Sequence, residues 1–224
     1  MIIFVPMKWF ISVFLTLLAC AACAPSGLHN GDLVFVGIPS DYRINGSMSD
    51  AIGDATSAGD QMNIIHAAIL EIQGDSAWII DATLKHGVDR HPLDTFLADF
   101  TLKDGSYPEF IVMRLKDDRE VGTYVENAKK YVGLKYNYAF IPCDTARYCT
   151  ELIRDSYVKS DGRHIFTEQP MNFLSPDGTM PEYWNELFAI LGMPVPQGLP
   201  GTNPRGMMEE KCLKRVRADL MPAN

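Results

Sequence analysis

Two apolar runs joined by a short turn constrain the fold of this chain more than any other feature. Asn63–Leu70 and Ala77–Ala82 both read as strands, and Gly74-Asp75 between them is a hairpin turn signal. The two runs are therefore expected to pair as antiparallel strands. Within each run one polar residue lies between apolar neighbours, His66 in the first and Asp81 in the second. The hairpin thus places an imidazole and a carboxylate on one small piece of sheet.

The setting of these two side chains predicts that they pair. His66 is expected to share a strand face with Ile64, Ala68 and Leu70, because alternate residues of a strand point the same way. A catalytic histidine needs a partner that fixes its tautomer, and an unpaired carboxylate in an apolar strand is costly. Two alternatives stay open: His66 is a core histidine, or Asp81 reaches water at a strand edge.

Shorter patterns elsewhere predict a mixture of strands and helices. A turn and a buried strand are expected at Gly31–Val36, and further strands at Gly87–Leu93 and Phe110–Leu115. Helices are expected at Met48–Ile52, Leu93–Phe100, Val121–Val132, from Cys149 to about Val158, and around Pro181–Phe188, while Lys135–Phe140 alternates weakly. From about residue 160 the chain is rich in Pro and Gly. Several hairpin-linked strands with few helices predict an α+β domain.

Cys149 opens the run Tyr148–Tyr157, which reads as the start of a helix. A thiol at a helix N-terminus feels the positive end of the helix dipole, which favours the thiolate. Cys143 is the competing thiol, but it directly precedes Asp144, and a nearby carboxylate disfavours the thiolate. We therefore expect Cys149 to be a nucleophile with His66 as its base, the pairing found in cysteine acyl-transfer enzymes.

The N-terminus has the features of an export signal. Lys8 precedes an apolar stretch from Trp9 to Ala19, which is short for a membrane span and typical of a secretory signal peptide over residues 1–20. The stretch ends Leu-Leu-Ala-Cys20, which resembles the lipobox of bacterial lipoproteins, where the cysteine becomes the lipidated first residue. Cys23 is a weaker alternative. Met7 is an alternative start to Met1.

Composition excludes several classes of protein. About 200 of the 224 residues remain after an export segment, enough for one domain. A net charge of −8 argues against nucleic-acid binding through phosphates. The cysteines beyond the export segment show no paired spacing, so no metal or cofactor is expected, and a Cys143–Cys212 disulfide stays open. Four further histidines lie in polar or loop segments and are expected at the surface: His29, His86, His91 and His164.

Six segments together resemble one known family: Gly31–Phe35, His66 in its strand, Ile80–Ala82, Gly87-Val88, Gly133–Asn137 and Tyr148–Ile153. They look like the permuted papain-like cysteine amidases of the YaeF/YiiX group, in the superfamily of NlpC-type cell-wall endopeptidases. The resemblance implies a circularly permuted papain-like fold, in which a small antiparallel sheet or barrel packs on the helix that carries the nucleophile. It implies a single hydrolase domain over residues 27–224, with a C-terminal extension from about residue 160.

The resemblance also assigns the catalytic residues. Cys149 matches the nucleophile of the family and His66 matches the base. Asp81 stands where a Glu is expected as the third residue, and Tyr136 is the next candidate for the site if Asp81 lies far from His66. Asn137 stands where Asp is usual, which is a second departure from the family pattern.

The same resemblance implies a function for the exported chain. Tyr136 and Tyr148 are expected to bind substrate, and Pro200–Pro204 is expected to line the cleft, as in lipoprotein members of the group. The chain is interpreted as a membrane-anchored lipoprotein of the bacterial cell envelope that hydrolyses an amide bond, as an amidase or endopeptidase. Its substrates would be peptidoglycan stem peptides or N-acyl amides. The alternative is an inactive lipoprotein that binds a cell-wall or lipid fragment.

Overall fold

A six-stranded antiparallel sheet forms the centre of the computed structural model, which describes residues 27–220 except 45, 57, 58, 60 and 219. The export segment and its two candidate lipidation cysteines lie outside the described residues. From edge to edge the strands are β10 (Leu213–Val216), β5 (Glu109–Leu115), β1 (Leu33–Pro39), β2 (Met62–Gln73), β3 (Ser76–Thr83) and β4 (Gly87–Pro92). The expected α+β class is confirmed.

The hairpin expected from the sequence is present in this sheet, next to the edge strand β4. β2 and β3 pair antiparallel, with Ile69 opposite Ile80 and Gln73 opposite Ser76, and the turn falls at Gly74-Asp75. The alternation of side chains along β2 is interrupted at one position. Val36 of β1 pairs with His66 but Gly37 pairs with Ile64, so Ile65 is an extra, bulged residue. The bulge turns Ile64 away from the face that His66 shares with Ala68 and Leu70.

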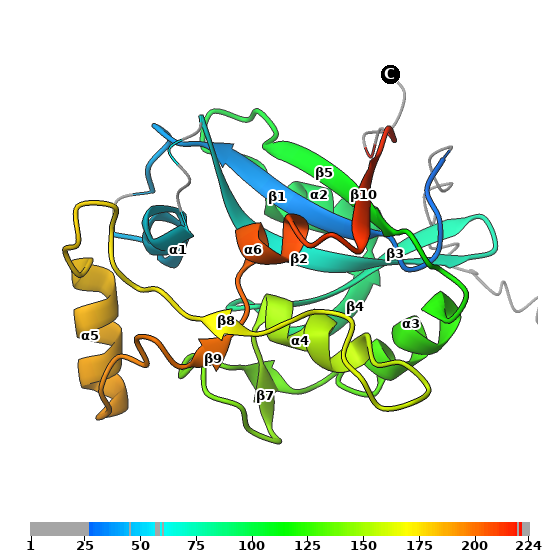
Figure 1. The fold of residues 1–224 in the computed structure, drawn as a ribbon. Helices are drawn as coiled ribbons and strands as arrows, with labels where there is room; N and C mark the ends of the chain where they lie inside the picture. Colours follow the sequence, from blue (N-terminus) through cyan, green and yellow to red (C-terminus); the bar gives the residue numbers. More distant parts are fainter. Residues whose placement is uncertain (1–26, 45, 57–58, 60, 219, 221–224) are drawn as a thin grey trace, which may run out of the picture.

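Helices cover both faces of the sheet (Figure 1). α2 (Leu93–Asp99) packs on one face with Phe96 buried against it. The other face carries the larger core, to which α1 (Met48–Thr56), α3 (Val121–Lys129), α4 (Cys149–Ser156), α5 (Glu182–Leu191) and α6 (Pro204–Met208) all contribute buried side chains. α4 contacts β2 and β3 directly, so the helix that begins at Cys149 lies on the β2–β3 hairpin that carries His66 and Asp81.

Two very short ladders hold the segments around α4. β6 (Lys135–Tyr136) pairs in parallel with β7 (Ala146–Arg147), so only the first two residues of the weakly alternating Lys135–Phe140 run are a strand. β8 (Gln169–Pro170) pairs with β9 (Pro200–Gly201). Because β7 ends two residues before Cys149, the β6–β7 ladder determines where α4 begins.

The C-terminal extension is more closely integrated than its Pro and Gly content suggests. β10 pairs with β5 and forms an edge of the main sheet, with Leu213 opposite Leu115 and Val216 opposite Val112. Trp184 of α5 and Met207 of α6 are buried in the larger core. The tail thus contributes both to the sheet and to the packing around α4.

Candidate active site

Cys149 is the first residue of α4 and is buried, with 4% of its surface exposed. Tyr148 before it is extended, and its backbone N–H donates to the Glu151 carboxylate at 3.1 Å. This is one half of a capping box, which ties down the entry to the helix. The N–H groups of the first helical turn have no partners within the helix, so they are available beside the thiol.

Glu151 is itself held by Asn137, the residue that departs from the family pattern. The Asn137 side-chain amide donates to Glu151 Oε2 at 3.0 Å and to the Ile141 carbonyl at 2.8 Å. Burial raises the Glu151 pKa to about 6, against the opposing effect of the hydrogen bonds from Asn137 and the Tyr148 N–H. An aspartate at 137 could not donate to this carboxylate, whereas the asparagine can, so the departure fits its surroundings.

Replacing Glu151 by Gln is expected to remove one contribution to the pH dependence of the unfolding free energy. A carboxyl group whose folded pKa is raised stabilises the fold fully below its unfolded value of 4.5, and that contribution is lost as the pH rises through about 6. Gln keeps an acceptor for Tyr148 and Asn137 but does not titrate. The free energy of unfolding in urea should therefore fall by about 1–2 kcal/mol more between pH 4.5 and 7 in the wild type than in Glu151→Gln. Equal slopes would show that Glu151 does not titrate in this range.

His66 lies between a carboxylate and the thiol. Its Nε2 is 2.8 Å from Asp81 Oδ2, well within the reach expected from the hairpin. The ring also hydrogen-bonds Cys149, and because Nε2 is occupied by Asp81, Nδ1 is the nitrogen left for the thiol. Burial alone lowers the His66 pKa, but the hydrogen bonds to Asp81 and Cys149 outweigh it and raise the pKa to about 10. The structure thus brings the three predicted catalytic residues together.

Asp81 is fully buried and contacts more than one histidine. Its Oδ1 is 3.1 Å from His91 Nε2, on the neighbouring strand β4. Burial acts to raise the Asp81 pKa, but the hydrogen bonds from His66 and His91 outweigh this effect and lower the pKa to about 2. This carboxylate is therefore ionised at neutral pH. The expectation that His91 lies at the surface is wrong, because alternation along β4 turns it inward beside β3, where it is 7% exposed.

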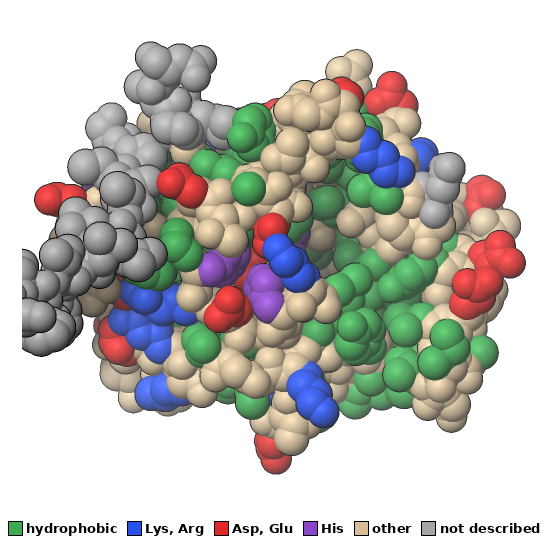
Figure 2. All heavy atoms as spheres, turned by 180° about the vertical axis from the view of Figure 1, so that it is seen from behind, with side chains coloured by type: hydrophobic (Ala, Val, Ile, Leu, Met, Phe, Trp, Pro, Cys, Tyr) green, Lys and Arg blue, Asp and Glu red, His purple; other side chains and the backbone are tan. Residues whose placement is uncertain are grey.

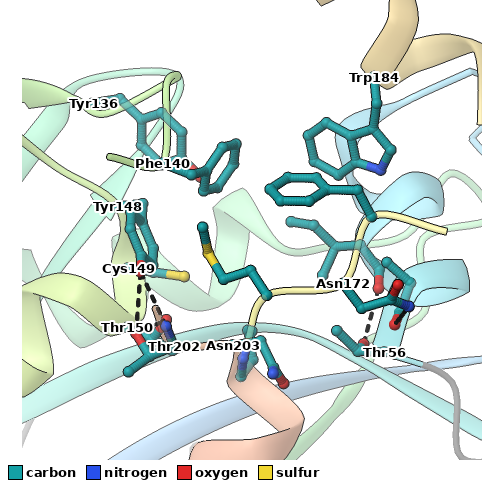
Figure 3. Close-up of a pocket in the computed structure, with 15 residues that line it drawn as sticks. Thr56, Tyr136, Phe140, Tyr148, Cys149, Thr150, Asn172, Trp184, Thr202 and Asn203 are labelled. Carbon is teal, nitrogen blue, oxygen red and sulfur yellow. Dashed lines mark hydrogen bonds between the residues drawn. The ribbon is translucent and has the colours of Figure 1, made fainter. Parts of the chain in front are cut away.

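A narrow apolar pocket opens on one side of Cys149 (Figure 3). Tyr136, Phe140 and Tyr148 lie around the thiol, while Trp184, Asn172 and Thr56 lie across the pocket from it. The Tyr148 hydroxyl accepts from the Thr202 backbone N–H at 3.1 Å, which attaches the tail to the start of α4. The complete lining is Ile52, Ala55, Thr56, Tyr136, Phe140, Tyr148, Cys149, Thr150, Met171, Asn172, Phe173, Trp184, Thr202, Asn203 and Pro204.

A second, more polar pocket lies on the other side of the thiol. Cys149, Tyr136 and Ile52 line both pockets, so the thiol stands where the two meet. His66 lines only this second pocket, and a 2.7 Å ion pair between Lys85 and Asp99 lies on its wall. The other lining residues are Met48, Ser49, Ile65, Ala82, Thr83, Leu84 and Phe100.

The pocket walls include residues that sequence reasoning did not select. Ala55 and Thr56 come from α1, and Phe140 lines the pocket with a positive φ of 54°, which is uncommon for a side chain of its size. The tail residues 202–204 do line the pocket, as expected. Cys143 is an exposed free thiol and Cys212 is also free, so the disulfide left open between them is not formed.

Comparison with known proteins identifies the family and the fold of this chain. The sequence profile of the family described as "Permuted papain-like amidase enzyme, YaeF/YiiX, C92 family" matches residues 27–217. The chain therefore belongs to the permuted papain-like amidases of the YaeF/YiiX, C92 family. No curated protein matches significantly. The crystal structure of "metalloprotein yiiX" from Escherichia coli O157:H7 has a similar fold, with a TM-score of 0.65 and 21% identity over 86% of this chain and 98% of that one.

Proposed function

We propose that this protein is an exported thiol amidase that cleaves N-acyl amides through Cys149, His66 and Asp81. Cys149 is the nucleophile, His66 is the general base and acid, and Asp81 orients the imidazole. The observation that carries the proposal is the position of Cys149 at the junction of an apolar pocket and a more polar pocket, called the polar pocket below. Family membership supports amide hydrolysis as the reaction class.

The two pockets support one orientation of the substrate. His66 must give its proton to the leaving amine, and it lines only the polar pocket. The amine side of the substrate therefore belongs in that pocket, near Lys85 and Asp99. The acyl side is left for the apolar pocket, whose walls include Phe140, Met171 and Trp184. A peptidoglycan stem peptide would place polar groups on these walls, so an N-acyl amide is the better fit.

The residues support a two-step acyl transfer. The raised pKa of His66 keeps its ring protonated at neutral pH, so the ring already holds the proton given up by Cys149. The sulfur attacks the amide carbonyl carbon as a thiolate, and backbone N–H groups at the start of α4 stabilise the oxyanion. Collapse breaks the C–N bond, and His66 delivers that proton to the departing amine. Water then attacks the thioester with His66 as base, which releases a carboxylic acid and the free thiol. No step of this scheme uses a metal, although the E. coli relative is described as a metalloprotein.

The substrate class is tested with a panel of amides of one amine and increasing acyl length. Each methylene that enters the apolar pocket contributes about 0.8 kcal/mol, so kcat/KM should rise about fourfold per carbon until the pocket is full. Purified muropeptides are the second arm of the panel. Cleavage of muropeptides with no response to acyl length would replace the N-acyl assignment with a cell-wall peptide.

Thr56→Phe is expected to shorten the apolar pocket from its far side. Thr56 ends α1 and lines the pocket across from Cys149 (Figure 3). A phenyl ring there should leave kcat/KM for short acyl amides within about twofold of the wild type. For the longest acyl amides it should lower kcat/KM by about 10- to 100-fold, because two or three methylenes can no longer be buried in the pocket. Thr123→Phe, on the exposed side of α3, is the matched control. An equal loss at every acyl length would show that Thr56 does not limit the pocket.

We also propose that Cys20 carries a lipid anchor. The support is the Leu-Leu-Ala-Cys20 sequence after an apolar stretch. Separately, within the described part of the chain no helix is both long and apolar enough to cross a membrane. Inhibition of lipoprotein signal peptidase should make the larger, uncleaved precursor accumulate, and Cys20→Ala should abolish lipid attachment and change the electrophoretic mobility. Membrane attachment with unchanged electrophoretic mobility in Cys20→Ala would assign the anchor elsewhere.

A further inference from the structure

Asp81 is approached by three histidines, of which the proposed hydrolysis uses one. Oδ2 of the carboxylate binds His66, and Oδ1 faces His91 Nε2 at 3.1 Å and His86 Nε2 at 3.8 Å. The ligand atoms of Asp81, His86 and His91 all lie within 4.8 Å of one another. Histidine side chains also reach the surface beside acidic side chains on the back face of the molecule (Figure 2). This cluster opens toward solvent through His86, whose side chain is 18% exposed.

The tautomer of His86 is determined by its backbone contact. Its Nδ1 is 3.0 Å from the Gly87 carbonyl, which can only accept, so Nδ1 carries a hydrogen. The neutral ring then directs the lone pair of Nε2 toward the cluster. That Nε2 atom is buried and has no hydrogen-bond partner among the described residues, and 3.8 Å is too long for a hydrogen bond to Asp81. Metal-bound histidines show this arrangement, with one nitrogen donating to a backbone carbonyl and the other free to ligate.

The local backbone holds this arrangement in place. Gly87 has φ = 73°, and a Cβ there would lie 2.3 Å from the Leu134 carbonyl oxygen, so the residue after His86 must be glycine. Val88 N–H donates to the same Leu134 carbonyl at 2.8 Å, which anchors the turn. His91 is held from the opposite side, since its ring packs edge-on against His86 with centroids 5.0 Å apart.

We propose that Asp81 Oδ1, His86 Nε2 and His91 Nε2 form a binding site for a divalent transition metal of the Zn²⁺ type. Two imidazoles and a carboxylate suit Zn²⁺ and its neighbours, whereas Mg²⁺ and Ca²⁺ prefer oxygen-only sets. Ligand atoms around tetrahedral Zn²⁺ lie about 3.3 Å apart, so only His86 has to move inward. His91 ligates in the tautomer that carries its hydrogen on Nδ1. Three protein ligands leave a fourth tetrahedral position for water or another ligand.

The site shares one residue with the proposed catalytic machinery. Oδ2 of Asp81 stays with His66 while Oδ1 binds the metal, so one carboxylate would bridge the metal and the general base. This separates the proposed site from a metal held by the Cys149 thiol and His66, which would need no contribution from His86. The inference rests on the donor atoms alone and stands whether or not the amidase assignment is correct.

The test titrates untagged protein with Zn²⁺ in a calorimeter and records the visible spectrum with Co²⁺. Cys149→Ala should still bind one metal ion, and its Co²⁺ complex should lack a sulfur-to-metal charge-transfer band. His86→Gln in that background should weaken binding about tenfold or more, and His91→Gln should do the same where circular dichroism shows an unchanged fold. His164→Gln removes an exposed imidazole elsewhere and should bind like its parent.

Three results would overturn the site. The first is the absence of stoichiometric binding to the wild type. The second is loss of binding in Cys149→Ala with retention in His86→Gln, which would place the metal on the thiol and His66. The third is a charge-transfer band that disappears in Cys149→Ala together with the bound metal. Because every readout is binding and not turnover, failure of the amidase assignment leaves this result interpretable.

Discussion

Cys149→Ala is expected to abolish amide hydrolysis while leaving the protein folded. Among the described residues no other thiol lines either pocket, so the rate should fall to that of the uncatalysed reaction in the assay. The side chain is small and lies between two pockets, so its loss should cost about 1 kcal/mol or less of unfolding free energy. The measurement is turnover of an N-acyl amide, with a urea unfolding curve of the same preparation.

Cys143→Ala is the matched control for this variant. Cys143 lies six residues upstream, is exposed, and directs its sulfur toward the Ala146 carbonyl at 3.8 Å. It lines neither pocket beside Cys149, so activity should remain within about twofold of the wild type. An active Cys149→Ala together with an inactive Cys143→Ala would reverse the assignment of the nucleophile.

His66→Ala should remove nearly all turnover, because His66 is the base that hydrogen-bonds the Cys149 thiol. The loss is expected to approach that of Cys149→Ala, since nucleophile and base act as one unit and their losses do not add. Combining the two substitutions should therefore change little further. Turnover in His66→Ala within about tenfold of the wild type would show that another group takes the thiol proton.

Asp81→Asn tests separately two roles of the carboxylate: holding the orientation of the His66 ring and stabilising its positive charge. The amide can still hold the His66 ring but cannot stabilise the imidazolium, so kcat/KM should fall by about 10- to 1,000-fold, less than for His66→Ala. His91 also loses a charged partner in this variant, since it shares the carboxylate at 3.1 Å. His91→Gln therefore serves as the control, and it should keep most of the activity. A larger loss of kcat/KM in His91→Gln than in Asp81→Asn would contradict the assignment of Asp81 as the residue that orients His66.

The parts of the site that follow from local sequence could be predicted from it. Alternation and a Gly74-Asp75 turn define the β2–β3 hairpin, and the hairpin brings His66 to Asp81. The helical pattern after Tyr148 places Cys149 at the start of α4. These features depend on neighbours along the chain, so a single sequence contains enough information to place them.

The parts that depend on distant segments could not be predicted. Nothing in the sequence near His91 shows that it faces Asp81, because that contact follows from the pairing of β3 with β4 and from the turn at Gly87. The pairing of β10 with β5 and the contribution of Thr56 to the pocket join residues far apart in the chain. The bulge at Ile65 appears only when β1 is paired with β2.

The most direct test of the proposed mechanism is detection of the acyl-enzyme by intact-protein mass spectrometry. Wild-type protein is mixed with an activated long-chain acyl ester, quenched in acid within one turnover, and digested to locate the adduct. We expect a mass increase equal to one acyl group less one hydrogen, located on Cys149 and absent from Cys149→Ala. An adduct on another residue, or complete turnover with no adduct under single-turnover conditions, would contradict it.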